Sequence, residues 1–111
     1  MEFKPCVIVP VYRHENTVRT VVQKLNSQNL PVVIVDDGNT PEALQVLQKV
    51  AEEIPNVMVV SHSVNMGKGG AVCTGCKEAL KAGFTHALQI DADGQHDPSM
   101  IPFLLKAARK H

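Results

Sequence analysis

The sequence of 111 residues has few aromatic residues and no excess of charge of either sign. It contains three phenylalanines, one tyrosine and no tryptophan, so it lacks the stacking platforms on which proteins bind single-stranded nucleic acid. Eleven basic residues balance eleven acidic ones, which leaves no basic footprint for DNA or RNA. We therefore expect no nucleic-acid partner. Hydrophobic residues make up 44% of the chain and charged ones 20%, which favours a single globular domain over residues 1–111.

Long hydrophobic segments are also absent. No run approaches the ~20 apolar residues that a membrane-spanning helix needs. The first residues, Met-Glu-Phe-Lys-Pro, show no signal-peptide pattern. We therefore expect no transmembrane segment in this chain and a cytoplasmic location. The three cysteines are an odd number, and in that compartment we expect them to be free thiols.

Apolar β-branched runs alternate with segments whose apolar residues recur at helical spacing. The sequence predicts strands over residues 6–11, 31–35, 56–60 and 85–90, and helices over residues 16–28, 41–54, 68–82 and 98–109. Thr40 before Pro41 is typical of a helix start. Asp97 before Pro98 follows the same logic, and Gly83 indicates a helix end.

This order of elements predicts an α/β fold. The strands are apolar on both faces, as in a parallel sheet covered by helices on both sides. Right-handed crossovers then give a doubly wound, Rossmann-like sheet of four mainly parallel strands. Numbering the strands along the chain, we expect the order 3-2-1-4. Ligands bind such a sheet at the carboxyl ends of the strands, where the order reverses.

The unusual residues of the chain gather at these strand ends. They occupy residues 10–15, 36–38, 65–70 and 91–96. Because the carboxyl ends of parallel strands meet at one edge of the sheet, the fold alone predicts a ligand site there.

Asp91 and Asp93 are two residues apart on an extended segment. Their side chains point the same way, with Cα atoms roughly 6–7 Å apart. Two carboxylates that close repel each other unless a cation lies between them, and Mg²⁺ or Mn²⁺ meets that need. Gln95 can add a neutral oxygen ligand, and His96 is a weaker candidate. The alternative is that one aspartate caps a turn and Gly94 permits the bend.

The stretch Asn-Met-Gly-Lys-Gly-Gly at residues 65–70 opens a predicted helix. Glycines let the backbone approach a ligand closely, and helix N-termini favour anions. Lys68 adds a positive charge for a phosphate group. The alternative is a glycine-rich turn that packs the helix closely against a strand.

Asp36 and Asp37 end another predicted strand. In a nucleotide-binding sheet an acid at this place can reach the base or the ribose, and Glu15 can contact the same nucleotide. The alternative for the pair is an Asx-type turn.

Cys73 and Cys76 form a CxxC pattern, which occurs in redox pairs and zinc sites. No second cysteine pair is present, and the pattern lies inside a predicted helix. We therefore favour a packing role, with both thiols on the face that meets the sheet. The histidines follow no ligand spacing, so we expect residues such as His62 to be surface or core-edge residues.

Four motifs in this order resemble the family 2 glycosyltransferases of GT-A fold, over about residues 5–105. They are Val7-Ile8-Val9-Pro10-Val11-Tyr12 with Glu15, Val35-Asp36-Asp37-Gly38, Asn65-Met66-Gly67-Lys68-Gly69-Gly70-Ala71 and Asp91-Ala92-Asp93-Gly94-Gln95-His96. The last motif is most similar to the dolichyl- or polyprenyl-phosphate mannose and glucose synthase branch.

The resemblance implies a metal-dependent transfer of sugar from a UDP-, GDP- or related nucleotide sugar to a lipid-phosphate or saccharide acceptor. The implied nucleotide-sugar-binding residues are Pro10, Tyr12, Glu15, Asp36, Asp37, Lys68, Asp91 and Ala92. The implied metal ligands are Asp91, Asp93 and Gln95, holding Mg²⁺ or Mn²⁺. The metal would neutralise charge on the departing nucleoside diphosphate.

The chain departs from the family pattern in two motifs and in length. Arg13-His14 stands where Asn or Tyr-Asn is commoner, and Asn39 replaces the usual Ser. Neither change removes an implied ligand, but both leave the base and the sugar open. Family members are much longer, and their second half carries the acceptor site and the catalytic base. We therefore expect the donor-binding half of a glycosyltransferase, either truncated from a longer protein or serving a larger one as a domain, without catalytic residues and inactive alone.

Two other readings remain open. One is a non-catalytic nucleotide- or metal-binding module, or an assembly domain that forms a homodimer through a sheet edge. The other is a phosphatase similar to the haloacid dehalogenases, whose Asp-x-Asp-Gly motif normally follows the first strand. Here the motif follows the fourth predicted strand, which argues against that reading.

Overall fold

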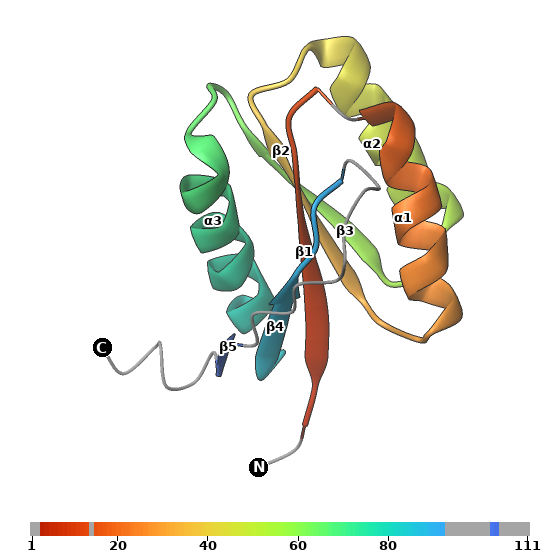
Figure 1. Ribbon diagram of the computed structural model, residues 1–111, viewed down its shortest axis with the longest axis vertical. Helices are drawn as coiled ribbons and strands as arrows, with labels where there is room; N and C mark the ends of the chain where they lie inside the picture. The colour runs from red at the N-terminus through yellow and green to blue at the C-terminus, as the bar shows by residue number, and fades with distance from the viewer. Residues whose placement is uncertain (1–2, 14, 93–102, 105–111) are drawn as a thin grey trace.

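The computed structural model describes residues 3–13, 15–92 and 103–104. In this part of the chain a five-stranded sheet has the order β3-β2-β1-β4-β5, and helices cover both of its faces (Figure 1). The elements are β1 (Pro5–Val11), α1 (Glu15–Ser27), β2 (Val32–Asp37), α2 (Pro41–Glu53), β3 (Val57–His62), α3 (Gly67–Lys81), β4 (His86–Gln89) and β5 (Phe103–Leu104).

The first four strands are parallel and confirm the predicted order 3-2-1-4. Helix α3 lies on one face of the sheet, and α1 and α2 lie together on the other (Figure 1). Most element ends agree with the sequence prediction within one or two residues. β2 and β3 each continue two residues beyond their predicted ends, and β2 so carries both aspartates inside the sheet.

The predicted helix over residues 98–109 is wrong at residues 103–104, where the chain forms β5. This strand pairs antiparallel with β4, with Leu104 opposite His86 and Phe103 opposite Ala87. The cap-and-proline signal at Asp97 is local, whereas the edge of β4 presents backbone groups that need partners. The other residues of the predicted helix lie outside the described residues.

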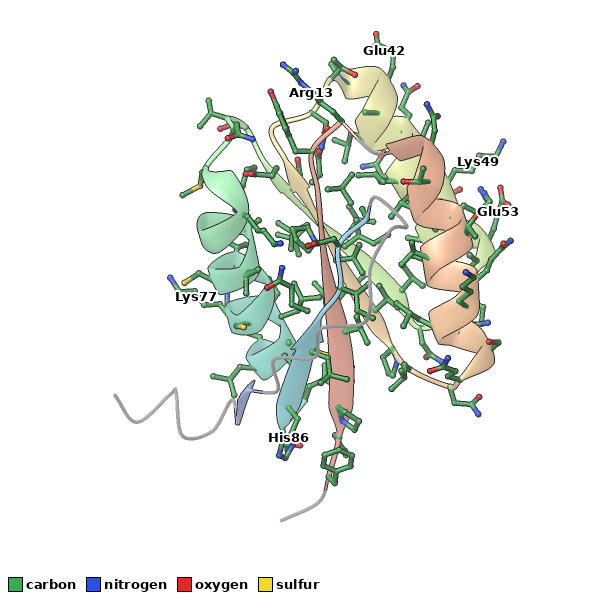
Figure 2. All side chains as sticks on the ribbon, viewed as in Figure 1. Arg13, Glu42, Lys49, Glu53, Lys77 and His86 are labelled. Carbon is green, nitrogen blue, oxygen red and sulfur yellow. The ribbon has the colours of Figure 1, made fainter. Side chains whose placement is uncertain are left out.

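Alternation along the strands divides the core into two clusters. The cluster beneath α1 and α2 takes from β1 and β2 the residues Val7, Val9, Val11, Val32 and Ile34. The cluster beneath α3 takes Cys6, Ile8, Val33 and Val35. Charged side chains labelled on the helices, such as Lys49 and Glu53 of α2 and Lys77 of α3, point away from the sheet (Figure 2). The central strands are therefore buried on both sides, as their continuous apolar sequence predicts.

Helix α3 approaches the sheet closely because small residues face it. A Cβ atom at Gly75 would lie 2.6 Å from Cγ2 of Ile8 and 3.2 Å from Cγ2 of Val35. The helix ends at Lys81 with Ala82 as its C-cap, and Gly83, whose φ is 96°, follows as the predicted helix-ending glycine. There the N–H of Phe84 donates to the carbonyl of Ala79 (3.1 Å) and that of Gly83 to the carbonyl of Leu80 (3.1 Å), a Schellman motif.

Among the described residues, no helix has both the length and the apolar composition needed to cross a bilayer.

Replacing Gly75 tests the close approach of α3. We expect Gly75→Ala to destabilise the protein by about 1–3 kcal/mol, because the added methyl group overpacks against Ile8 and Val35. The matched control is Gly69→Ala in the same helix, where a Cβ meets nothing within 4 Å. That change should be neutral or stabilising by up to about 1 kcal/mol. Urea unfolding of both variants measures the difference, and equal stabilities would contradict the packing described.

Candidate functional site

A pocket of about 360 Å³ opens at the carboxyl edge of the sheet. It is lined by Pro10, Val11, Tyr12, Asp37, Asn65, Gly67, Lys68, Asp91 and Ala92. These residues come from the ends of β1 and β2, the segment before α3, its first turn, and the segment after β4. The pocket lies where the strand order reverses, between β1 and β4, the place at which such sheets bind ligands.

Most of the residues implied for nucleotide-sugar binding meet in this pocket. They are Pro10, Tyr12, Asp37, Lys68, Asp91 and Ala92. Asp36 is not among the lining residues. The side chain of Glu15 and the whole of Asp93 and Gln95 lie outside the described residues.

Lys68 and Asp91 form an ion pair inside the pocket. The Lys68 Nζ atom lies 2.7 Å from Asp91 Oδ1, and the amide of Gln89 donates to the same oxygen at 3.2 Å. The hydroxyl of Thr17 on α1 donates to the carbonyl of Ala92, which anchors the segment after β4. The pocket therefore presents a cationic and an anionic side chain in contact.

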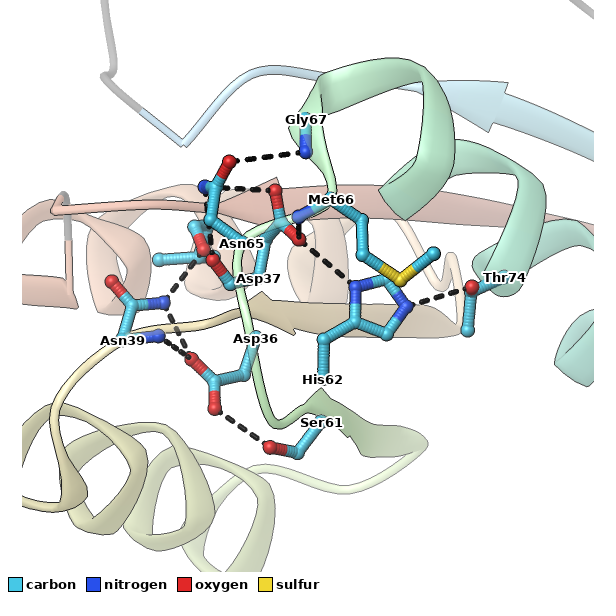
Figure 3. A network of polar contacts seen from close by, with 10 residues as sticks. Asp36, Asp37, Asn39, Ser61, His62, Asn65, Met66, Gly67 and Thr74 are labelled. Carbon is cyan, nitrogen blue, oxygen red and sulfur yellow. Dashed lines mark hydrogen bonds and ion pairs between the residues drawn. The ribbon is translucent and has the colours of Figure 1, made fainter.

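Asp37 is the centre of a buried hydrogen-bond network (Figure 3). Its side chain is 4% exposed. Oδ1 accepts from His62 Nδ1 (2.9 Å) and from the N–H of Met66 (2.8 Å), and Oδ2 accepts from the Asn65 amide (3.2 Å). Because a carboxylate only accepts, the proton of His62 lies on Nδ1. The other ring nitrogen contacts Thr74 Oγ1 of α3 at 2.8 Å. The network thus joins β2, β3 and α3.

His62 is a residue whose role the sequence did not indicate. We expected a surface or core-edge residue, and His62 is a partly buried residue at the end of β3, with its side chain 9% exposed between Asp37 and Thr74. No ligand spacing could have shown this, because its two partners lie on other elements.

Gly38, with φ of 75°, lets the loop before α3 approach the end of β2. A Cβ atom at Gly38 would lie 2.3 Å from the backbone nitrogen of Asn65.

The buried Asp36 carboxylate is also satisfied within the protein (Figure 3). Oδ1 accepts from the backbone N–H of Asn39 (3.3 Å) and from its side-chain amide, and Oδ2 accepts from the Ser61 hydroxyl (2.9 Å). Both oxygens therefore have partners that hold the turn after β2 and the end of β3.

Asn39 connects this turn to the loop that carries Tyr12. Its Nδ2 donates to the carbonyl of Val11 (2.7 Å), and its Oδ1 accepts from the N–H of Arg13 (2.8 Å). Arg13 has a left-handed backbone with φ of 66°, and its guanidinium carbon lies 4.9 Å from the centre of the Tyr12 ring. The Asn39 amide donates from its nitrogen and accepts at its oxygen. A serine side chain is shorter and has only one polar atom to make these contacts.

The cysteines are free, as predicted. Cys76 packs against the cluster beneath α3, whereas Cys73 is exposed. The expectation that both thiols face the sheet is therefore wrong for Cys73, because residues three apart on a helix differ in direction by about 60°. Burial, with a smaller contribution from nearby Cys76, raises the pKa of Cys6 to about 12.

The fold and the pocket define the class of protein. A Rossmann-like parallel sheet with a charged pocket at its switch point is typical of nucleotide-binding proteins. Comparison with known families then identifies the chain: residues 6–111 match glycosyl transferase family 2. The chain belongs to that family, as its four motifs indicated.

The relatives include enzymes that act on lipid phosphates. The chain is 33% identical over 108 residues to a UDP-N-acetylglucosamine–dolichyl-phosphate N-acetylglucosaminyltransferase of Methanococcus voltae, covering 86% of this chain and 43% of that protein. It is 30% identical over 104 residues to an undecaprenyl-phosphate mannosyltransferase of Micrococcus luteus, covering 92% and 43%. The chain therefore spans less than half the length of these curated relatives.

A solved structure supports the fold. A mannosyltransferase from Pyrobaculum calidifontis, in complex with GDP-mannose and Mn²⁺, superposes with a TM-score of 0.70 at 23% identity. The match covers 84% of this chain and 28% of that one. The similarity confirms the GT-A architecture of the sheet and helices.

Replacing Asn39 tests the connection between the two loops. Asn39→Asp is nearly isosteric but loses both side-chain donors and places a carboxylate beside Asp36. We expect a loss of about 1–3 kcal/mol in the free energy of unfolding at pH 7. The loss should shrink in acid, because a protonated carboxyl regains a donor.

Asn39→Ser serves as the matched control, since it removes the connection without adding charge, and its loss of stability should not depend on pH. Emission from Tyr12, the only tyrosine in a chain without tryptophan, reports on the loop directly. Acrylamide quenching of this emission should change in both variants. A pH-independent loss in Asn39→Asp would contradict the contact with Asp36.

The thiol of Cys6 should make stability depend on alkaline pH. Its pKa is about 12 in the folded chain against 9.0 for an ordinary thiol, so the folded state keeps the proton longer than the unfolded state. This contribution is intact below pH 9 and is lost as pH rises towards 12. Urea unfolding of Cys6→Ala over this range should give a shallower decline than the unsubstituted chain. Parallel declines would contradict the assignment.

Proposed function

We propose that residues 1–111 form the donor-binding domain of a glycosyltransferase that moves a sugar from a nucleoside diphosphate sugar to a lipid-phosphate acceptor. The observation that carries the proposal is the pocket at the switch point of the sheet, where Lys68 and Asp91 meet beside Tyr12. A saccharide acceptor is the alternative. The domain supplies no catalytic base in this proposal, and the acceptor site and the base come from outside it.

The lining of the pocket suits the two ends of a nucleoside diphosphate. Pro10, Val11 and Tyr12 form a largely apolar wall from β1 and its loop, against which a nucleobase can pack. Lys68 and the first turn of α3 offer positive charge for the diphosphate. Asp37 supports the wall of the pocket and is not the group that binds the ligand in this proposal, because its carboxylate already accepts hydrogen bonds from His62 and Met66.

The donor chemistry of the pocket fits a divalent cation. The Asp91 carboxylate already holds a cationic group, the ammonium of Lys68, at 2.7 Å, and hard oxygen donors suit Mg²⁺ or Mn²⁺. Asp91 would hold the metal with Asp93 and Gln95, which lie outside the described residues. When bound, the metal supplies charge neutralisation for the leaving diphosphate. The described residues by themselves contain no cluster of three His, Cys, Asp or Glu ligands.

The relatives support the choice of substrates. Those quoted above act on dolichyl or undecaprenyl phosphate, and the similar solved structure holds GDP-mannose with Mn²⁺. A lipid-phosphate acceptor would place the reaction at a membrane surface, and we propose its cytoplasmic face.

Calorimetric titration with UDP and GDP in the presence of Mn²⁺ tests the donor site. We expect one of the two nucleotides to bind, and chelation of the metal to weaken that binding. Asp91→Asn and Asp93→Ala should each weaken it by about tenfold or more, equivalent to about 1.4 kcal/mol.

Glu52→Gln, on the exposed surface of α2, is the matched control for loss of one negative charge. Absence of binding by both nucleotides would refute the donor site and favour an assembly module. Binding that survives both chelation and Asp93→Ala would refute the metal site. Sugar transfer by the isolated chain would show that the catalytic base lies within it.

A further inference from the structure

The ion pair in the pocket joins two elements that are far apart in the sequence. Lys68 is the second residue of α3, and Asp91 follows the end of β4. Their side chains are 57% and 39% exposed, so both reach solvent from the pocket. An ion pair with this exposure contributes little to folding and is easily exchanged for other partners. Its place in the pocket therefore matters more for ligands than for stability.

The surroundings of Lys68 offer a second place for a negative charge. The first turn of α3 contains no acidic residue, and Met66 at its N-cap supplies no side-chain cap. The buried Asp37 carboxylate accepts the N–H of Met66, and Asn65 Oδ1 accepts that of Gly67 at 3.2 Å. Gly67 and Lys68 both line the pocket. A phosphate group at this end of the helix would attract the Lys68 ammonium and would compete for it with the Asp91 carboxylate.

The Lys68–Asp91 pair should therefore affect the binding of a bare cation and the binding of a cation with diphosphate differently. A divalent cation bound alone at Asp91 would compete with Lys68 for the carboxylate. It would also lie near the Lys68 ammonium with no further negative charge to offset the repulsion. A cation that enters with a diphosphate brings the counter-ion with it, because Lys68 can turn to a phosphate oxygen while Asp91 turns to the metal.

We propose that Lys68 is an internal counter-ion for Asp91 that makes the site select a cation–diphosphate complex over the bare cation. This inference rests on the proposed donor site. It adds that Lys68 changes the affinity for the metal alone and the affinity for the metal with nucleotide in opposite directions. Lys68 weakens the binding of the metal alone and strengthens the binding of the nucleoside diphosphate with the metal.

The experiment compares Lys68→Met, which keeps most of the length and removes the charge, with Lys68→Arg, which keeps the charge. The matched control is Lys77→Met, which removes a charge from the outer side of the same helix (Figure 2). Binding of Mn²⁺ alone is measured by electron paramagnetic resonance. Binding of GDP and UDP at saturating Mn²⁺ is measured by calorimetry.

In Lys68→Met we expect Mn²⁺ alone to bind about two- to fivefold more tightly, the range that corresponds to an exposed ion pair. The nucleotide with Mn²⁺ should bind at least about threefold more weakly in the same variant, because its phosphates lose a cation. Lys77→Met should resemble the unsubstituted chain in both measurements. Lys68→Arg, which keeps the charge, should bind Mn²⁺ alone no more tightly than the unsubstituted chain.

Unchanged, weaker or undetectable binding of Mn²⁺ alone by Lys68→Met overturns the inference, even where the unsubstituted chain binds nucleotide and the donor site stands. Tighter binding that also appears in Lys77→Met overturns it too, since the effect would then be general electrostatics. Failure of the donor site is a separate result, in which the unsubstituted chain binds neither GDP nor UDP with Mn²⁺.

Discussion

The buried carboxylate of Asp37 is the constraint on which the site depends. A carboxylate at this depth is costly unless its oxygens have hydrogen-bond donors. His62, Asn65 and the backbone of Met66 provide them. Meeting that need fixes the loop between β3 and α3, and with it the first turn of the helix. The position of Lys68 in the pocket is therefore a consequence of how a buried charge on a neighbouring strand is satisfied.

The two aspartates at the end of β2 each stabilise a different wall of the pocket. Asp37 fixes the loop before α3, and Asp36, through Asn39, fixes the turn after β2 and the loop that carries Tyr12. Both walls thus rest on adjacent residues of one central strand. Such an arrangement leaves Lys68 and Asp91 as the charged side chains of the pocket that reach solvent, and it explains how a neutral domain can offer both signs of charge to one ligand.

Much of the fold follows from patterns that operate over a few residues. The continuous apolar runs of β1 and β2, the cap at Thr40 and the glycine at the end of α3 depend on local sterics and hydrogen bonding. The carboxyl-edge position of the pocket follows from the parallel order of these strands. The prediction was wrong where a distant partner decided the outcome. Residues 103–104 form a strand because the edge of β4 is available to pair with them. The error at Cys73 has a local cause instead, since residues three apart on a helix differ in direction by about 60°.

The sequence by itself determined the family, the order of elements and which residues gather at the ligand edge, because motif spacing and strand periodicity are properties of the chain. Only the tertiary structure decided what those residues do to one another. It placed His62 between Asp37 and Thr74, joined Asn39 to the Tyr12 loop and paired Lys68 with Asp91. The physical reason is that these contacts join different strands, helices and loops. Hydrogen bonds and ion pairs act over a few ångströms in space, and no spacing along the sequence records which side chains meet there.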